Sequence, residues 1–263
     1  MSKTLKIVFF GSGPVAARSL DFLVKNFDVE AVITKASPKH HRGNAPVEDL
    51  AKEKNIPILF ANSKSELEEV VLNTTFKSKL GVVIDYGVLA SEKTIGAFPL
   101  GIVNSHFSLL PQWKGADPIT YSLLSGQQKT GVSLMVIEPA LDTGKLITQK
   151  NLVIEKDDTG VSLTEKLIDL SNKLLADHLP RYVNGEIKLR SQPHPSRATY
   201  SKKLKKSDGN IDWNKSAEVI EREIRAYSEW PRSRTKIGEV DCIITKAQLI
   251  EENGESGQYT TND

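Results

Sequence analysis

The sequence predicts an α/β protein: a doubly wound, mainly parallel sheet, followed by a small second domain of one helix and short strands. Short apolar runs alternate with amphipathic segments from Leu5 to about Ile154, and this alternation is typical of parallel strands covered by helices on both faces. A proline-rich stretch without periodicity then indicates a domain boundary. We therefore expect a first domain over residues 1–185, a linker over 186–200 and a second domain over 201–263.

The individual elements follow from apolar periodicity and from residues that favour helix ends. Strands are expected at 5–10, 29–34, 56–59, 80–84 and 101–103, and helices at 14–26, 46–54, 66–75 and 118–125. Two longer strands at 131–137 and 145–154 should follow, and then a helix at 163–183, which Ser162 and Glu165 would open as a capping box. The last part should contain a helix near 217–227 and strands at 232–237 and 240–250.

The composition is ordinary for a globular protein and leaves the class of partner open. Lysine and arginine exceed aspartate and glutamate by only two, 35 against 33, so the global charge does not indicate a nucleic-acid partner. The single cysteine, Cys242, cannot form an internal disulfide, which fits a reducing, cytoplasmic environment. No apolar run approaches the length of a membrane span, so we expect no contact with a membrane.

One polar grouping supports a hypothesis about function. Asn104 and His106 follow a short apolar run, so they lie at the carboxyl end of an expected strand, where open α/β sheets bind their ligands. Residues two apart in extended backbone point the same way, so the amide and the imidazole can converge on one substrate atom. Asp142, in the turn between the two longer strands, could orient the imidazole from its far side. These three groups suit acyl transfer without a covalent intermediate.

Other interpretations of these motifs are weaker. Gly11 and Gly13 lie between a strand and a helix as in a dinucleotide-binding turn, but the second strand runs into Lys35 without the acid that would bind a ribose. A tight structural turn is therefore favoured. Ser108 lacks the nucleophile-elbow pattern of a serine hydrolase and is only two residues from His106. The histidines lack the spacing of metal ligands, so no metal is expected.

Four motifs together resemble a known family, the formyltransferases that use 10-formyltetrahydrofolate. The motifs are Val-Asn-Ser-His at 103–106, Ser-Leu-Leu-Pro at 108–111, Trp-Lys-Gly-Ala at 113–116 and Leu-Asp-Thr-Gly at 141–144. Further segments, 210–213 and 224–231, look like the start of the carboxyl-terminal domain of that family. The resemblance therefore covers nearly the whole chain.

The resemblance implies a Rossmann-like catalytic domain that takes 10-formyltetrahydrofolate as its formyl donor and needs no metal. It implies that Asn104, His106 and Asp142 are the catalytic residues. It also implies a loop that contacts the folate, made of Ser108, Leu109, Leu110 and Pro111. The second domain would be OB-like, with only part of the barrel present in this chain.

Within the family, the resemblance is greatest to the enzymes that formylate initiator methionyl-tRNA in translation initiation. Lys39 and Arg42 lie in an early basic loop, and basic runs at 202–206 and 232–236 lie in the second domain. Each of these could contact tRNA phosphates, although a basic run alone is more often a solvated surface. No protein partner is expected.

Three alternatives stay open at the level of the sequence. A sugar-nucleotide N-formyltransferase, which acts on an amino sugar, would have the same three catalytic residues. A formyltetrahydrofolate hydrolase would use water as the acceptor. A non-catalytic RNA-binding protein on an enzyme scaffold would not need an amide, an imidazole and a carboxylate together, so the intact set argues against it.

Overall fold

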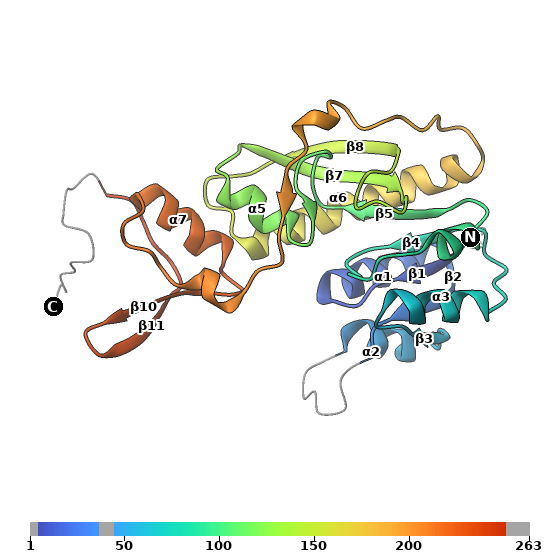
Figure 1. Ribbon diagram of the computed structural model, residues 1–263, viewed down its shortest axis with the longest axis horizontal. Helices are drawn as coiled ribbons and strands as arrows, with labels where there is room; N and C mark the ends of the chain where they lie inside the picture. The colour runs from blue at the N-terminus through green and yellow to red at the C-terminus, as the bar shows by residue number, and fades with distance from the viewer. Residues whose placement is uncertain (1–4, 37–44, 251–263) are drawn as a thin grey trace.

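The computed structural model describes residues 5–36 and 45–250, and its main feature is a seven-stranded sheet (Figure 1). In spatial order the strands are β3 (Ile58–Phe60), β2 (Asp28–Thr34), β1 (Lys6–Phe10), β4 (Gly81–Val83), β5 (Ile102–His106), β7 (Lys129–Val136) and β8 (Leu146–Val153). The first five are parallel to one another, whereas β7 is antiparallel to both β5 and β8. The predicted mainly parallel sheet is confirmed.

Helices cover both faces of this sheet, as a doubly wound fold requires. They are α1 (Pro14–Asn26), α2 (Pro46–Glu53), α3 (Lys64–Leu72), α4 (Glu92–Gly96), α5 (Pro118–Leu124) and α6 (Gly160–Val183). Alternate residues of β1 face opposite sides: Ile7 and Phe9 belong to the core formed with α1, α2 and α6. Val8 and Phe10 belong to the core formed with α3.

Strand β5 continues beyond its expected end. The sequence predicts an end at Val103, but the backbones of Asn104, Ser105 and His106 pair with β7, so the strand ends at His106. The sequence does not predict this extension, because the apolar run ends before these polar side chains. Asn104 and His106 therefore lie on the strand itself. Asn104 pairs with β4 on one side and with β7 on the other, and His106 pairs with β7, so the sheet fixes the backbone that carries both side chains.

The start of α6 is also corrected. Its capping box is made by Thr159 and Ser162, each of which accepts a hydrogen bond from the other's backbone N–H, and not by Ser162 and Glu165. The short helix α4, capped by Ser91, was not expected at all. Among the described helices, none has the length and apolar character needed to cross a membrane.

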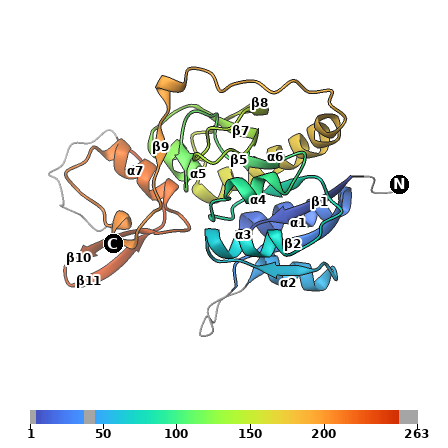
Figure 2. The ribbon, with the colours of Figure 1, turned by 45° about the vertical axis from the view of Figure 1, so that its right-hand side comes forward.

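The small second domain consists of α7 (Ala217–Ala226) and a hairpin of β10 (Ser233–Ile237) and β11 (Val240–Ile244). Figures 1 and 2 show α7 next to α5, at the far end of the chain's first domain. The described residues of this domain form no closed barrel. The second strand ends at Ile244 and not at 250 as expected.

Residues 186–200, the expected linker, are called the connecting segment below. They run back along the first domain before the second one begins (Figure 2). Arg190 forms a two-way backbone bridge with Leu146. At the other end β9 (Tyr200–Ser201) pairs with β6 (Lys114–Gly115), in the loop that follows His106. The connecting segment therefore contacts the elements that carry the candidate site.

Candidate active site

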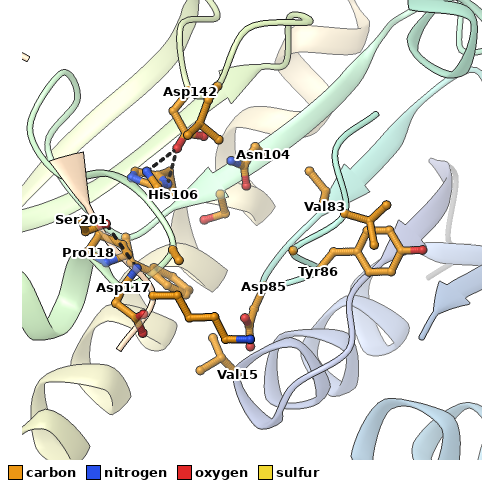
Figure 3. A pocket seen from close by; sticks show the side chains of 18 of the residues that line it. Val15, Val83, Asp85, Tyr86, Asn104, His106, Asp117, Pro118, Asp142 and Ser201 are labelled. Carbon is orange, nitrogen blue, oxygen red and sulfur yellow. Dashed lines mark hydrogen bonds and ion pairs between the residues drawn. The ribbon is translucent and has the colours of Figure 1, made fainter. Parts of the chain in front are cut away.

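A cavity of about 820 Å³ opens at the carboxyl ends of the parallel strands (Figure 3). Its walls come from the loops after β1, β4, β5 and β7 and from the start of α5. The second domain also contributes, through Lys203, Leu204 and Trp230. The site is thus located where an open α/β sheet binds its ligands, and it is completed by residues from the far end of the sequence.

The structure brings Asn104, His106 and Asp142 together on one wall of this cavity. The imidazole Nδ1 of His106 lies 3.8 Å from Oδ2 of Asp142, and the two residues are only 6% and 9% exposed. Asn104 is partly exposed and lies beside this pair (Figure 3). The predicted convergence of an amide, an imidazole and a carboxylate is therefore present, and its reactive face is open to the cavity.

The hydrogen bonds of His106 identify its neutral tautomer. Nε2 lies 2.9 Å from the backbone carbonyl of Trp113, and a carbonyl oxygen can only accept. Nε2 therefore carries the hydrogen and donates it to Trp113. In the neutral ring, Nδ1 then has a free lone pair and faces Asp142. The hydrogen on Nε2 is therefore already in use and is not free to donate to a substrate atom.

Asp142 is held in a strained turn. Its φ of 50° lies in the left-handed region, which costs energy for a residue with a side chain. Its Oδ2 accepts a hydrogen bond of 2.8 Å from the N–H of Gly115. Gly115 itself has φ 114°, and a Cβ there would collide with the carbonyl of Ser201. The carboxylate thus lies between His106 and a backbone donor that only glycine can place there.

A further residue of the site was missed by the sequence analysis. Gln192 of the connecting segment donates from Nε2 to the carbonyls of Asp142 (2.8 Å) and Gly144 (3.0 Å). It is 8% exposed. The proline-rich, aperiodic surroundings gave no signal for a buried side chain, so only the tertiary structure identifies it.

The Ser-Leu-Leu-Pro loop lies outside the cavity. None of its four residues lines the wall: Ser108, Leu110 and Pro111 are buried elsewhere and Leu109 is half-buried. Ser133 of β7 donates to the carbonyl of Ser108 (2.6 Å) and accepts from the N–H of Leu110 (3.0 Å). The side chains of this loop therefore shape the chain between His106 and Trp113 and do not line the space available to a ligand.

The cavity has an apolar part and a charged part. The apolar part is lined by the loop after β4 (Tyr86 to Ala90) and by side chains of the sheet such as Phe10 and Ile137. The charged part contains Lys35, Asp85, Asp117 and Lys203. The Asp85 side chain is exposed to the cavity, yet desolvation by the surrounding protein, together with the nearby Asp117 carboxylate, raises its pKa to about 6, while Lys35 acts against this shift. Asn104 and His106 lie where the two parts meet (Figure 3).

The glycine-rich turn after β1 is explained by packing against the loop after β4. The N–H of Ser12 donates to the carbonyl of Asp85 (3.1 Å), and a Cβ on Gly13 would collide with the Asp85 carboxylate. A carboxylate of the chain itself therefore occupies the start of α1. This accounts for the glycines by a tight structural turn, the interpretation that the sequence favours over a dinucleotide site.

The basic residues predicted to contact tRNA are only partly visible. Lys39 and Arg42 lie outside the described residues. Lys202, Lys203, Lys205 and Lys206 are exposed around the buried Leu204, and Lys203 lines the cavity. Within the described ranges, no group of three or more His, Cys, Asp or Glu side chains is arranged to hold a metal ion.

Comparisons with known proteins identify the family. Residues 5–179 match the formyl transferase family model, and residues 203–263 match that of the formyl transferase C-terminal domain. The chain belongs to the formyltransferase family. It is 36% identical over 255 residues to methionyl-tRNA formyltransferase of Coxiella burnetii, covering 95% of this chain and 81% of the relative. It is 33% identical over 256 residues to methionyl-tRNA formyltransferase of Thermotoga maritima, covering 95% and 82%.

Solved structures agree on the fold. An N-formyltransferase from Helicobacter canadensis, solved with folinic acid and dTDP-3-aminofucose, superposes with a TM-score of 0.72 over 95% of this chain and 89% of its own, at 21% identity. Phosphoribosylglycinamide formyltransferase from Bacillus halodurans gives a TM-score of 0.58 over 69% of this chain and 96% of its own, at 26% identity. The smaller enzyme matches a smaller share of this chain, as expected where only one domain is common.

Proposed function

We propose that the chain transfers the formyl group of 10-formyltetrahydrofolate to the amino group of methionyl-tRNA. The observation that supports this most is the convergence of Asn104, His106 and Asp142 on one wall of an open cavity. Relatives at 33–36% identity that carry this activity in their names, matched over 95% of the chain, point to the same acceptor.

The chemistry follows from the geometry of these groups. The acceptor amine must be unprotonated, and an aminoacyl amine titrates at a pH of roughly 7 to 8. When its nitrogen adds to the formyl carbon, an oxyanion forms, and the Asn104 amide donates to it. The proton lost by the nitrogen moves to Nδ1 of His106, the ring atom with the free lone pair. That proton then passes to the folate nitrogen as the carbon–nitrogen bond to the donor breaks.

Asp142 supports the charged intermediate of the ring. Once Nδ1 is protonated, the imidazolium carries a positive charge that faces the Asp142 carboxylate 3.8 Å away. In a site this buried, the attraction between these two opposite charges is stronger than it would be in water. Trp113 keeps the other nitrogen occupied, so proton transfer is directed to Nδ1. No step requires a metal ion.

The two parts of the cavity suggest where each substrate binds. The apolar part after β4 suits the flat ring system of the folate, and the charged part towards the second domain suits the aminoacyl end of the tRNA. This revises the expectation that Ser108, Leu109, Leu110 and Pro111 contact the folate directly. Lys39, Arg42, Lys203 and the nearby basic run stay our proposed phosphate contacts.

The amino-sugar acceptor is the main rival, because the structure from Helicobacter canadensis was solved with an amino-sugar nucleotide. The test supplies 10-formyltetrahydrofolate with either methionyl-tRNA or an amino-sugar nucleotide and measures which product is formylated. Transfer to methionyl-tRNA with a KM that rises steeply with salt is the expected result. Transfer to the sugar alone, or loss of the formyl group to water without any amine, would refute the assignment.

A further inference from the structure

The connecting segment contains one buried side chain among exposed neighbours. Gln192 is 8% exposed, whereas Ser191 and each residue of 193–197 are exposed. A long polar side chain loses rotamer freedom and hydration when it is buried, so a position of this kind calls for a specific partner. The partner here is the turn that carries Asp142.

Gln192 uses both hydrogens of its amide group on that turn. Nε2 donates to the carbonyl of Asp142 and to that of Gly144, on either side of Thr143. Its Oε1 is buried without a hydrogen-bond partner among the described residues. An apolar side chain of similar size would avoid that unpaired oxygen, but it could not bridge two carbonyls. The geometry therefore singles out the donor function of this side chain.

We infer that Gln192 is a positioning residue that fixes the Asp142 carboxylate against His106; this inference deepens the proposed function and rests on it. Asp142 lies at φ 50°, a conformation that persists only where its surroundings hold it. The two hydrogen bonds from Gln192 hold the backbone on both sides of that strained residue. Without them the turn can relax, and the carboxylate then leaves the position from which it faces Nδ1.

The same segment also holds the other side of His106. Thr199 accepts from the backbone N–H of Trp113 through Oγ1 (2.9 Å) and from that of Lys114 through its carbonyl (2.9 Å). The carbonyl of Trp113 is the partner of His106 Nε2. Both neighbours of the imidazole, one at each ring nitrogen, are thus tied to the connecting segment, and this segment leads directly into the second domain.

Two variants separate positioning from a purely structural role. Gln192→Met keeps the length of the side chain but cannot donate at any pH. Gln192→Glu keeps the shape; its ionised form cannot donate, and its protonated form can donate one hydrogen bond. Ser191→Ala, at the exposed neighbouring position, is the matched control. The wild type and the three variants are purified as full chains, and the folded fraction of each is determined before its kinetics are measured.

We expect Gln192→Met to lower kcat for methionyl-tRNA by up to about 100-fold, the cost of a misplaced catalytic group, with little change in KM for the folate. Gln192→Glu should lose a similar factor at pH 8 and recover part of it as the pH falls and the carboxyl group takes up a proton. The ratio of the two variants' kcat should therefore change with pH. A ratio that is independent of pH, or wild-type kcat in Gln192→Met, would overturn the inference.

A second measurement does not depend on activity. Amide hydrogen exchange reports the opening of the turn itself, so exchange over residues 138–146 should be faster in Gln192→Met than in the wild type or in Ser191→Ala. Unchanged exchange would overturn the positioning role even if the wild type formylated neither acceptor. Faster exchange with an inactive wild type would support the role of Gln192 in holding the turn and would refute only the proposed function.

Discussion

The loop after β5 and the turn at Asp142 meet at the same imidazole, yet they are anchored in different ways. The loop is held from within the sheet, where Ser133 of β7 and Gln149 of β8 bind the backbone of the Ser-Leu-Leu-Pro stretch. The turn is held from outside the sheet, by Gln192 of the connecting segment. The Ser-Leu-Leu-Pro part of the loop is therefore anchored in the core, whereas the turn depends on the connecting segment, as does the Trp113–Lys114 end of the loop, which Thr199 holds.

This difference predicts which property a substitution in each region should change. The anchor of the loop is fully buried and bonded on several sides, so its loss should reduce the stability of the fold. The anchor of the turn holds a strained residue at the edge of the cavity, so its loss should reduce turnover in a protein that stays folded. The substitutions below test this division, in order of decreasing expected effect.

Asp142→Asn tests whether the negative charge that the turn places beside His106 is needed for turnover. Asparagine tolerates the left-handed backbone, and its amide oxygen can still accept from Gly115, so folding should be preserved. The positive imidazolium would lose its counter-charge, and we expect kcat to fall by about 10³- to 10⁴-fold, the upper range for acid–base catalysis. Single-turnover formylation measures the fall in turnover, and a melting curve shows whether folding is preserved. Turnover close to that of the wild type would remove Asp142 from the mechanism.

Asn104→Ala tests the strand that supports the loop. The backbone of Asn104 is fixed by pairing with β4 and β7, so removing its side chain should not move the strand. The loss of one donor to the oxyanion should lower kcat by about 10²- to 10³-fold. Binding of the folate, measured at equilibrium, should weaken far less. An equal effect on binding and on kcat would instead assign Asn104 to ground-state recognition.

The sequence predicted most of the first domain, including the sheet that anchors the loop after β5. Apolar runs with helix signals between them located the strands and helices, since burial on both faces leaves little freedom in composition. The pairing of Asn104 with His106 could be predicted because residues two apart in extended backbone point the same way, whereas Asp142 lies in a turn further along the chain and reaches them through the tertiary structure. The end of β5 was wrong because polar side chains at the edge of a cavity interrupt the apolar run.

The connecting segment was not predictable in the same way. Gln192 contacts Asp142, fifty residues earlier in the chain, and nothing in the local pattern Ser-Gln-Pro-His-Pro indicates that contact. The direct folate contacts expected of residues 108–111 are a related case. The motif resembles that of the family, but its backbone is held by Ser133, which is distant in sequence, and none of its four residues lines the cavity.

Ser133→Ala tests the anchor of the loop. Ser133 is fully buried, and its hydroxyl bonds Ser108, Leu110 and Gln149. Alanine would leave buried backbone groups unpaired, at a cost of about 2 to 3 kcal/mol in the free energy of unfolding. Urea denaturation measures this loss. Its effect on kcat should be smaller than that of Gln192→Met, and the reverse order would contradict the proposed division between the two anchors.

Lys203→Ala tests the second domain's contribution to the cavity. If Lys203 contacts one phosphate of the acceptor, its removal should reduce the slope of log KM against log salt concentration by about 0.7 to 0.9. Formylation of methionyl-tRNA at several salt concentrations gives this slope. Lys25→Ala is the control, because Lys25 lies on α1 and pairs with Asp21 away from the cavity. Equal slopes for both variants would exclude a phosphate contact at Lys203.

Asp85→Asn tests the loop after β4, which lines the cavity and packs against the turn after β1. The pKa of Asp85 is raised from 3.8 to about 6, so between these values the folded protein binds more protons than the unfolded one. The stability of the wild type must therefore fall as the pH rises through that window. Asparagine tolerates φ 48° and does not ionise. The melting temperature of Asp85→Asn should accordingly exceed that of the wild type above pH 6, and this gain should vanish towards pH 4; a difference that stays constant with pH would contradict the raised pKa.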